Sequence, residues 1–183
     1  GIGADTRIGS KFLYPGCGYG GSCFPKDVKA LVKTAENRGY EMRVLKAVEE
    51  VNENQKHIVF NKLCKHYNGE LHGKVIAIWG LAFKPETDDM REATALITIN
   101  QLIKAGCKVQ VFDPVAMDEC KRRVGEGVTY AKDMYDAVLN ADALLLLTEW
   151  KQFRLPSWGV LKRTMNSPIT VSYTHLTLPT NSL

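Results

Sequence analysis

The sequence predicts an α/β protein in which a helical segment precedes a doubly wound, mainly parallel sheet. Short apolar runs that are typical of buried strands lie at residues 75–79 and 143–147, and residues 108–112 indicate a further strand that ends before Asp113-Pro114. Amphipathic stretches lie between these runs and are joined to them by short connections. Alternating strands and helices of this kind form parallel sheets with helices packed on both faces. Upstream of the first run, residues 42–67 show a helical rather than a strand period.

The first part of the chain is expected to form two helices. Pro25 suits the first turn of a helix and Gly39 suits its end, which predicts a helix over residues 26–38. A second, longer helix is expected over residues 42–67, because its apolar residues recur at steps of three, four or seven. The members of this stripe are Val44, Val48, Val51, Ile58 and Leu63. Such a stripe needs a covering surface, and a second copy of the chain is a candidate.

The second part is expected to alternate between strands and helices. Residues 75–79 form the first predicted strand. Asp89 and Glu92 resemble a capping box that opens the next helix, and Gly106 suits its end. The remaining predicted elements are a strand at 108–112, a helix at 117–124, a strand at 128–131, a helix at 134–139 and a strand at 143–147.

These patterns divide the chain into residues 1–69, residues 70–171 and a tail, residues 172–183. After about residue 170 no amphipathic period continues, so the tail is interpreted as non-native and excluded from the fold. The irregular glycine-rich opening is not how a compact domain usually begins. We therefore expect that the first part is truncated at its start and the second at its end.

Composition argues against several functional classes. The formal net charge is +4, but Lys and Arg are spread through the chain, so nucleic acid is not an expected partner. There is no apolar run of the ~20 residues that a membrane span needs, and no export leader, so a cytoplasmic location is expected. The five cysteines are unevenly spaced, which favours reduced thiols over disulfides and gives no metal-ligand set.

The segment 16–21, GCGYGG, formally matches the dinucleotide fingerprint G-x-G-x-x-G. That fingerprint needs a strand before it and an acidic residue that ends a second strand about 20 residues later. Tyr14-Pro15 is a poor strand end, and Glu36 and Glu41 lie in or between predicted helices. We interpret these glycines instead as positions that let backbone approach a ligand or hold a turn beside Cys23.

Cys23 has the surroundings of a reactive thiol. It lies just before the helix start at Pro25, where unpaired amides and the helix dipole favour the thiolate, and Lys26 favours it further. A thiolate held in this way is suited to attack a carbonyl, and Asp27 could position or deprotonate a water molecule. From these residues alone, a buried structural cysteine is an equally open interpretation. The cysteines that lack these features are Cys17, Cys64, Cys107 and Cys120.

Residues 7–9, 12–16 and 18–27 read RIG, FLYPG and GYGGSCFPKD. These motifs resemble the active-site segment of the UDP-glucose 6-dehydrogenases, which belong to the UDP-glucose/GDP-mannose dehydrogenase family. Residues 81–92 read LAFKPETDDMRE and resemble the motif of the family's UDP-binding domain. A weaker third match is TEW at residues 148–150. The resemblance is to the carboxyl-terminal half of the bacterial type.

The resemblance implies oxidation of the C6 alcohol of UDP-glucose to the acid by two hydride transfers to NAD. Between the transfers, a cysteine adds to the aldehyde as a thiohemiacetal, which is oxidised to a thioester and hydrolysed. It also implies that residues 1–69 hold an active-site loop and a central dimerisation segment, and that residues 70–171 form the UDP-binding domain. A homodimer through the central helix is the implied assembly.

The resemblance also assigns residue roles. Cys23 would be the nucleophile and Asp27 would assist the hydrolytic water, while Lys26 and Arg91 would contact NAD. The substrate-binding positions would be Arg7 across the dimer, the loop of Phe12, Leu13, Tyr14, Pro15 and Gly16, and further Gly20, Phe83 and Lys84.

The sequence also departs from the family pattern. The amino-terminal NAD-binding domain, three polar residues that precede Gly1 in the family, and a later Asp-Gly-Arg segment are absent. The chain alone is therefore expected to be inactive. Two alternatives stay open: a relative that oxidises GDP-mannose or a UDP-N-acetylhexosamine, and a non-catalytic module that binds nucleotide sugars and dimerises. The residues before Cys23 favour UDP-glucose over these other sugars.

Overall fold

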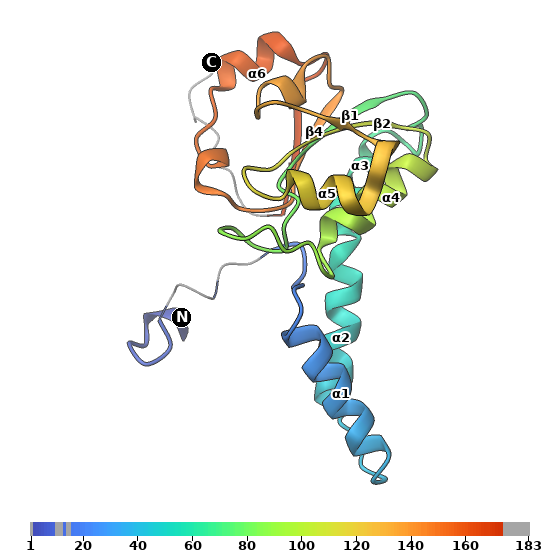
Figure 1. The fold of residues 1–183 in the computed structure, drawn as a ribbon, viewed down its shortest axis with the longest axis vertical. Coiled ribbons are helices and arrows are strands. Elements are labelled where there is room, and N and C mark those ends of the chain that lie inside the picture. Colours follow the sequence, from blue (N-terminus) through green and yellow to red (C-terminus); the bar gives the residue numbers. More distant parts are fainter. Residues whose placement is uncertain (1, 10–12, 14–15, 174–183) are drawn as a thin grey trace.

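A computed structural model describes residues 2–9, 13 and 16–173. Two helices project from a body in which helices pack around a parallel sheet (Figure 1). The helices of the first part are α1 (Phe24–Glu36), α2 (Arg43–Lys56) and α3 (Ile58–His66). Those of the second part are α4 (Thr94–Lys104), α5 (Met117–Val124) and α6 (Trp158–Thr164), with 3-10 turns at Ile2–Ala4, Gly125–Gly127, Asp136–Val138 and Lys151–Phe153.

The helix predicted over residues 26–38 is confirmed as α1, which begins two residues earlier with Cys23 at the N-cap and Pro25 in its first turn. Gly39 follows it with a φ of 74°, a left-handed conformation that glycine adopts without steric cost. The prediction of a single helix over residues 42–67 is wrong, because the helix is interrupted at His57. The N–H of His57 bonds the carbonyl of Asn54, three residues back, so the ladder tightens there and separates α2 from α3.

The described part of the chain contains a five-stranded sheet in the order β3-β2-β1-β4-β5, and every pairing is parallel. This confirms the doubly wound fold. The strands are β1 (Val75–Trp79), β2 (Lys108–Phe112), β3 (Thr129–Tyr130), β4 (Ala143–Leu146) and β5 (Ile169–Ser172). Successive strands first add on one side of β1 and then on the other, so the strand order reverses between β1 and β4. In open α/β sheets, ligands bind beyond the carboxyl ends of the strands at such a point.

Both faces of the sheet are buried, because the alternating residues of β1 enter different apolar clusters. Ile76 and Ile78 pack into the cluster that also contains residues of α3 and α4. Ala77 and Trp79 pack into a second cluster, where the Trp79 ring stacks on Phe153 with centroids 5.1 Å apart. Two buried faces explain why β1 and β4 appear in the sequence as uninterrupted apolar runs. No helix in the described part of the chain is long and apolar enough to cross a membrane.

Three further local predictions were wrong. The proposed capping box does not form, because α4 begins at Thr94 and Glu92 has a left-handed φ of 55°. The helix predicted at 134–139 is only a short 3-10 turn. No helix or strand was expected to continue after about residue 170, but β5 pairs with β4 as far as Ser172. Residues 174–183 of the proposed tail lie outside the described residues.

The carboxyl edge of the sheet is organised by the buried carboxylate of Asp113, which is 1% exposed. One of its oxygens accepts hydrogen bonds from the amides of Val115 and Ala116, each 2.9 Å long. The other accepts from the Leu81 amide at 2.7 Å, the Ala82 amide at 3.3 Å and the Trp150 indole at 3.1 Å. This single carboxylate therefore joins the loops that follow β1, β2 and β4.

We expect Asp113→Ala to lower the free energy of unfolding by roughly 3 kcal/mol or more, because it leaves several buried donors unpaired. Asp118→Ala, at a fully exposed position on α5, is the control and should cost less than about 1 kcal/mol. Urea denaturation followed by circular dichroism measures both. Equal effects of the two substitutions would contradict the role given to Asp113.

Candidate functional site

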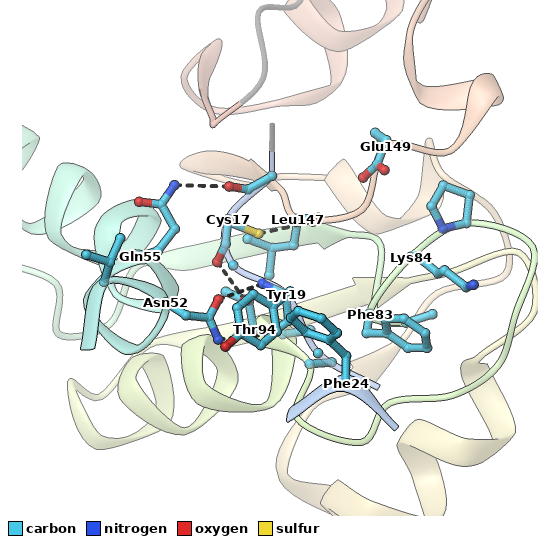
Figure 2. Close-up of a pocket in the computed structure, with 18 of the residues that line it drawn as sticks. Cys17, Tyr19, Phe24, Asn52, Gln55, Phe83, Lys84, Thr94, Leu147 and Glu149 are labelled. Carbon is cyan, nitrogen blue, oxygen red and sulfur yellow. Dashed lines mark hydrogen bonds between the residues drawn. The ribbon is translucent and has the colours of Figure 1, made fainter. Parts of the chain in front are cut away.

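A cleft of about 1170 Å³ lies at the carboxyl edge of the sheet, between the helical segment and the α/β body. One wall is the glycine-rich segment 16–20 together with α2, and the opposite wall is the turn after β1, with Phe83 and Lys84 (Figure 2). Its floor includes Thr94, at the start of α4, and Leu147. The remaining lining residues are Phe24, Val44, Ala47, Val48, Val51, Asn52, Gln55, Ala82, Pro85, Ala93, Ala95, Glu149 and Arg154.

Asn52 of α2 fixes one side of the glycine-rich segment. Its side-chain oxygen accepts from the Tyr19 amide at 2.7 Å, and its side-chain nitrogen donates to the Tyr19 carbonyl at 3.3 Å. Gln55, one turn later, donates to the carbonyl of Gly16 at 3.0 Å. Asn52 is buried although it is polar, and this pair of bonds satisfies both ends of its amide.

Cys17 fixes the other side. Its thiol donates to the Leu147 carbonyl at 3.2 Å, and its own carbonyl accepts from the Thr94 hydroxyl at 2.8 Å (Figure 2). Burial raises the pKa of the Cys17 thiol to about 11, so the group stays protonated near neutral pH. The segment is thus hydrogen-bonded to α2 on one side and to the sheet body on the other.

Three glycines of the segment 16–21, Gly18, Gly20 and Gly21, are needed for close packing inside the protein, whereas a Cβ on Gly16 would meet nothing within 4 Å. A Cβ on Gly18 would lie 2.9 Å from the Lys56 side chain, and one on Gly20 would lie 2.6 Å from the carbonyl oxygen of Glu92. A Cβ on Gly21 would lie 2.9 Å from the ring of Phe83. The expectation that these glycines hold a turn beside Cys23 agrees with this arrangement. No strand of the described chain precedes the segment, so the dinucleotide interpretation has no structural support.

Cys23 is exposed at the N-cap of α1, so the interpretation as a buried structural cysteine is wrong. Its thiol lies 3.6 Å from the Ser22 hydroxyl and is not part of the cleft lining. Asp27 is exposed one helical turn later, and its amide bonds the Cys23 carbonyl at 2.9 Å. Lys26 is also exposed in this first turn.

Arg91 approaches Cys23 from the α/β body. Its guanidinium forms an ion pair with Asp89, with Nη2 and Oδ2 2.9 Å apart, and this hydrogen bond raises the pKa of Arg91. Its backbone lies beside the segment that leads to Cys23, because the Arg91 carbonyl accepts a hydrogen bond from the Gly21 amide at 2.7 Å. The structure therefore brings Cys23, Lys26, Asp27 and Arg91 to one exposed region.

The remaining predicted site residues fall into two groups. Gly16, Gly20, Phe83 and Lys84 line the cleft, and the Lys84 ammonium lies 5.3 Å from the centre of the Phe83 ring. Exposed residues that are not part of the lining are Arg7, which pairs with Asp5 at 2.6 Å, and Leu13. Three predicted residues lie outside the described residues: Phe12, Tyr14 and Pro15.

Sequence reasoning missed the polar residues that hold the glycine-rich segment, namely Asn52, Gln55 and Thr94. A signal was available for the first two, because they interrupt the apolar stripe of α2 one turn apart. Nothing in the local sequence pairs Thr94 with Cys17, because their hydrogen bond joins residues 77 positions apart.

The described residues fit only the edge of an NAD site. Lys26 and Arg91 are exposed cations beside Cys23 that could face an anionic cofactor. The glycine-rich segment cannot cradle a pyrophosphate, because Lys56, Glu92 and Phe83 already occupy the space beside its glycines.

Comparison with known proteins agrees with this geometry. Residues 77–177 match the UDP-glucose/GDP-mannose dehydrogenase family, UDP binding domain, and residues 1–54 match the central domain of the same family. The chain belongs to the UDP-glucose/GDP-mannose dehydrogenase family. The cleft lies between the parts of the chain that match these two family domains.

The chain is 46% identical over 184 residues to the UDP-glucose 6-dehydrogenase of Pseudomonas aeruginosa, covering 98% of this chain and 41% of that protein. It is 45% identical to the UDP-glucose 6-dehydrogenase of Rhizobium meliloti, covering 93% and 39%. The solved structure of a UDP-glucose dehydrogenase from Pyrobaculum islandicum superposes with a TM-score of 0.79 at 32% identity, covering 93% and 41%. The chain thus spans about two fifths of the length of these relatives.

The environments of the cysteines predict selective labelling. At pH 8, iodoacetamide should modify the exposed Cys23 first. A thiol with a pKa of about 11, such as buried Cys17 or Cys120, is thiolate in only roughly one molecule in a thousand at this pH. We expect Cys17 and Cys120 to react at least about 100-fold more slowly than Cys23.

Peptide-resolved mass spectrometry measures each rate. Labelling under denaturing conditions is the control and should remove the difference between the cysteines. Comparable rates for Cys17 and Cys23 in the folded chain would contradict the arrangement.

Proposed function

We propose that this chain carries the nucleotide-sugar site and the reactive thiol of a UDP-glucose 6-dehydrogenase. The observation that carries the proposal is the cleft between Gly16–Gly20 and Phe83–Lys84, with Cys23 three residues beyond the segment that forms its wall. The two curated relatives described above are both UDP-glucose 6-dehydrogenases, which supports this substrate over GDP-mannose or a UDP-N-acetylhexosamine.

The cleft suits a nucleotide sugar in size and chemistry. Its volume of about 1170 Å³ exceeds the ~300–1,000 Å³ of typical small-molecule sites, which leaves room for a base, a diphosphate and a sugar. Phe83 offers an aromatic face and Lys84 a cation for the diphosphate. Gly16, where an added Cβ would meet nothing within 4 Å, leaves room for a ligand to approach its backbone closely.

The proposed chemistry of the chain itself centres on Cys23. Its thiolate adds to the C6 aldehyde carbon, and a proton reaches the carbonyl oxygen to complete a thiohemiacetal. The sulfur keeps the sugar bound and makes this carbon tetrahedral, so that it can release a hydride. Lys26 and Arg91 would hold NAD, which would supply the hydride acceptor for the oxidation of both the alcohol and the thiohemiacetal, and the thiohemiacetal hydroxyl would lose its proton as the thioester forms. The resulting thioester is attacked by water, which releases the acid and restores the thiolate.

Asp27 and the basic residues complete the proposed site. Asp27 lies on the same face of α1 as Cys23, since residues four positions apart are neighbours on a helix, and it would orient the hydrolytic water. Lys26 and Arg91 would face the cofactor. We retain the proposed division into residues 1–69, with a dimerisation segment, and residues 70–171, with the UDP-binding domain.

We further infer a homodimer through α2. Val44, Val48 and Val51 form an apolar stripe at steps of four and three, and they are 76%, 38% and 65% exposed. Because the same three valines line the cleft, a second copy of the chain that covers this stripe would border the cleft, and Arg7 would then serve the site of the partner. A cytoplasmic location stays a prediction.

Isothermal titration calorimetry tests the nucleotide-sugar site on the chain itself. We expect UDP-glucose to bind, and Lys84→Met to weaken binding by about tenfold or more, because a charge-assisted contact is lost. Lys104→Met, in the last turn of α4, is the matched control and should leave the affinity unchanged. Failure of the parent chain to bind UDP-glucose while it binds another sugar nucleotide would overturn the substrate.

A hybrid enzyme tests the chemistry. When this chain replaces the matching segment of the Pseudomonas relative, we expect about two NADH per UDP-glucose, as a four-electron oxidation through a cysteine requires. Cys23→Ala should abolish acid formation, whereas Cys64→Ala on α3 should retain it. The chain alone should form no NADH. Acid formation by the Cys23→Ala hybrid would refute the covalent mechanism.

A further inference from the structure

Glu92 connects three separate segments of the protein. It lies between β1 and α4, and its carboxylate meets Lys56 of α2 at 3.3 Å and Lys29 of α1 at 3.9 Å. Its backbone has a left-handed φ of 55°, which is unfavourable for a residue with a side chain. Surrounding contacts must hold such a residue in place, and the two lysines are contacts of this kind.

Lys56 is the buried partner in this group. Its side chain is only 3% exposed, and its ammonium lies 3.2 Å from Glu53 as well as 3.3 Å from Glu92. A buried ammonium is costly unless carboxylates pair with it, so both contacts matter. Its aliphatic stem packs directly beside Gly18, where an added Cβ would meet Cγ at 2.9 Å.

The backbone around Glu92 in turn contacts the segment that leads to Cys23. The carbonyl oxygen of Glu92 would lie 2.6 Å from a Cβ on Gly20. The neighbouring Arg91 carbonyl accepts a hydrogen bond from the Gly21 amide at 2.7 Å. Any shift of Glu92 therefore moves the surface against which Gly20 and Gly21 pack, two residues before the thiol.

We propose that Lys56 is a positioning residue for the Cys23 loop, acting through Glu92. Its stem supports Gly18 directly, while its ammonium holds Glu92 in the conformation that receives Gly20 and Gly21. Lys56 does not line the cleft, so its role is distinct from substrate binding. The catalytic meaning of this role rests on the proposed function of Cys23, but the positioning itself does not.

Hydrogen exchange of the 183-residue chain separates local positioning from general stability. In Lys56→Met, we expect the amides of Tyr19 and Gly21 to exchange about tenfold faster or more, because the loop opens more often. Amides within β1 and β4 should keep their parental rates. Lys56→Arg retains a cation within reach of Glu92 and should restore slow exchange in the loop.

Two further variants complete the test. Lys46→Met is the matched control, because Lys46 also lies on α2 and pairs with a glutamate, Glu36, at 2.9 Å, but on the exposed surface. It should leave the loop unchanged. Glu92→Gln should accelerate exchange in the same amides, and combining it with Lys56→Met should add little, since both remove one interaction. The Glu92 side chain is 46% exposed, so Glu92→Gln remains informative if Lys56→Met does not fold.

Parental loop exchange in both Lys56→Met and Glu92→Gln would overturn the proposal. So would an equal acceleration of loop and sheet amides, because that pattern indicates a loss of global stability alone. No substrate is needed for these measurements. A failure of UDP-glucose binding or turnover would therefore count against the proposed function and leave the positioning role intact.

Discussion

The site depends on one constraint: a segment almost without side chains must fit between two rigid walls. Gly18 faces α2, while Gly20 and Gly21 face the residues between β1 and α4. Asn52 secures the segment to the first wall, and the Thr94 hydroxyl secures it to the second. Because the segment contacts both walls, it fixes the position of the cleft that it lines and of the start of α1 that follows it. A methyl group at Gly20 would displace one wall from the other.

The sheet supplies the second wall in a form that leaves its carboxyl edge available. β1 is paired on both sides: β2 and β4 both follow it in the chain, but they lie on opposite sides of it in the sheet. The loops that leave these three strands converge on Asp113, which replaces water as their hydrogen-bond acceptor. The turn carrying Phe83 and Lys84 is thereby attached to the buried core, although Lys84 itself is exposed.

The sequence was sufficient for the fold class and for the residues whose role is local. Apolar runs predicted β1 and β4, because two buried faces leave no room for alternation, whereas β2 alternates between buried and more exposed residues. The proline and glycine at its ends predicted α1 and therefore the place of Cys23. Contacts between distant residues could not be predicted in this way. Glu92, whose left-handed conformation removes the expected capping box, pairs with lysines 36 and 63 positions earlier, Lys56 and Lys29.

The two-sided attachment of the glycine-rich segment has a consequence for how the protein folds. Its hydrogen bonds reach Asn52, Thr94 and Leu147, at sequence separations of 33, 77 and 130 residues. Contacts between residues so far apart close large loops. The chain entropy that is lost on closure is offset only after both partners of each contact are in place. The helices and the sheet can each form from nearer contacts. We therefore expect the segment to dock in a late step, so that an incompletely folded chain has the thiol but no organised cleft beside it.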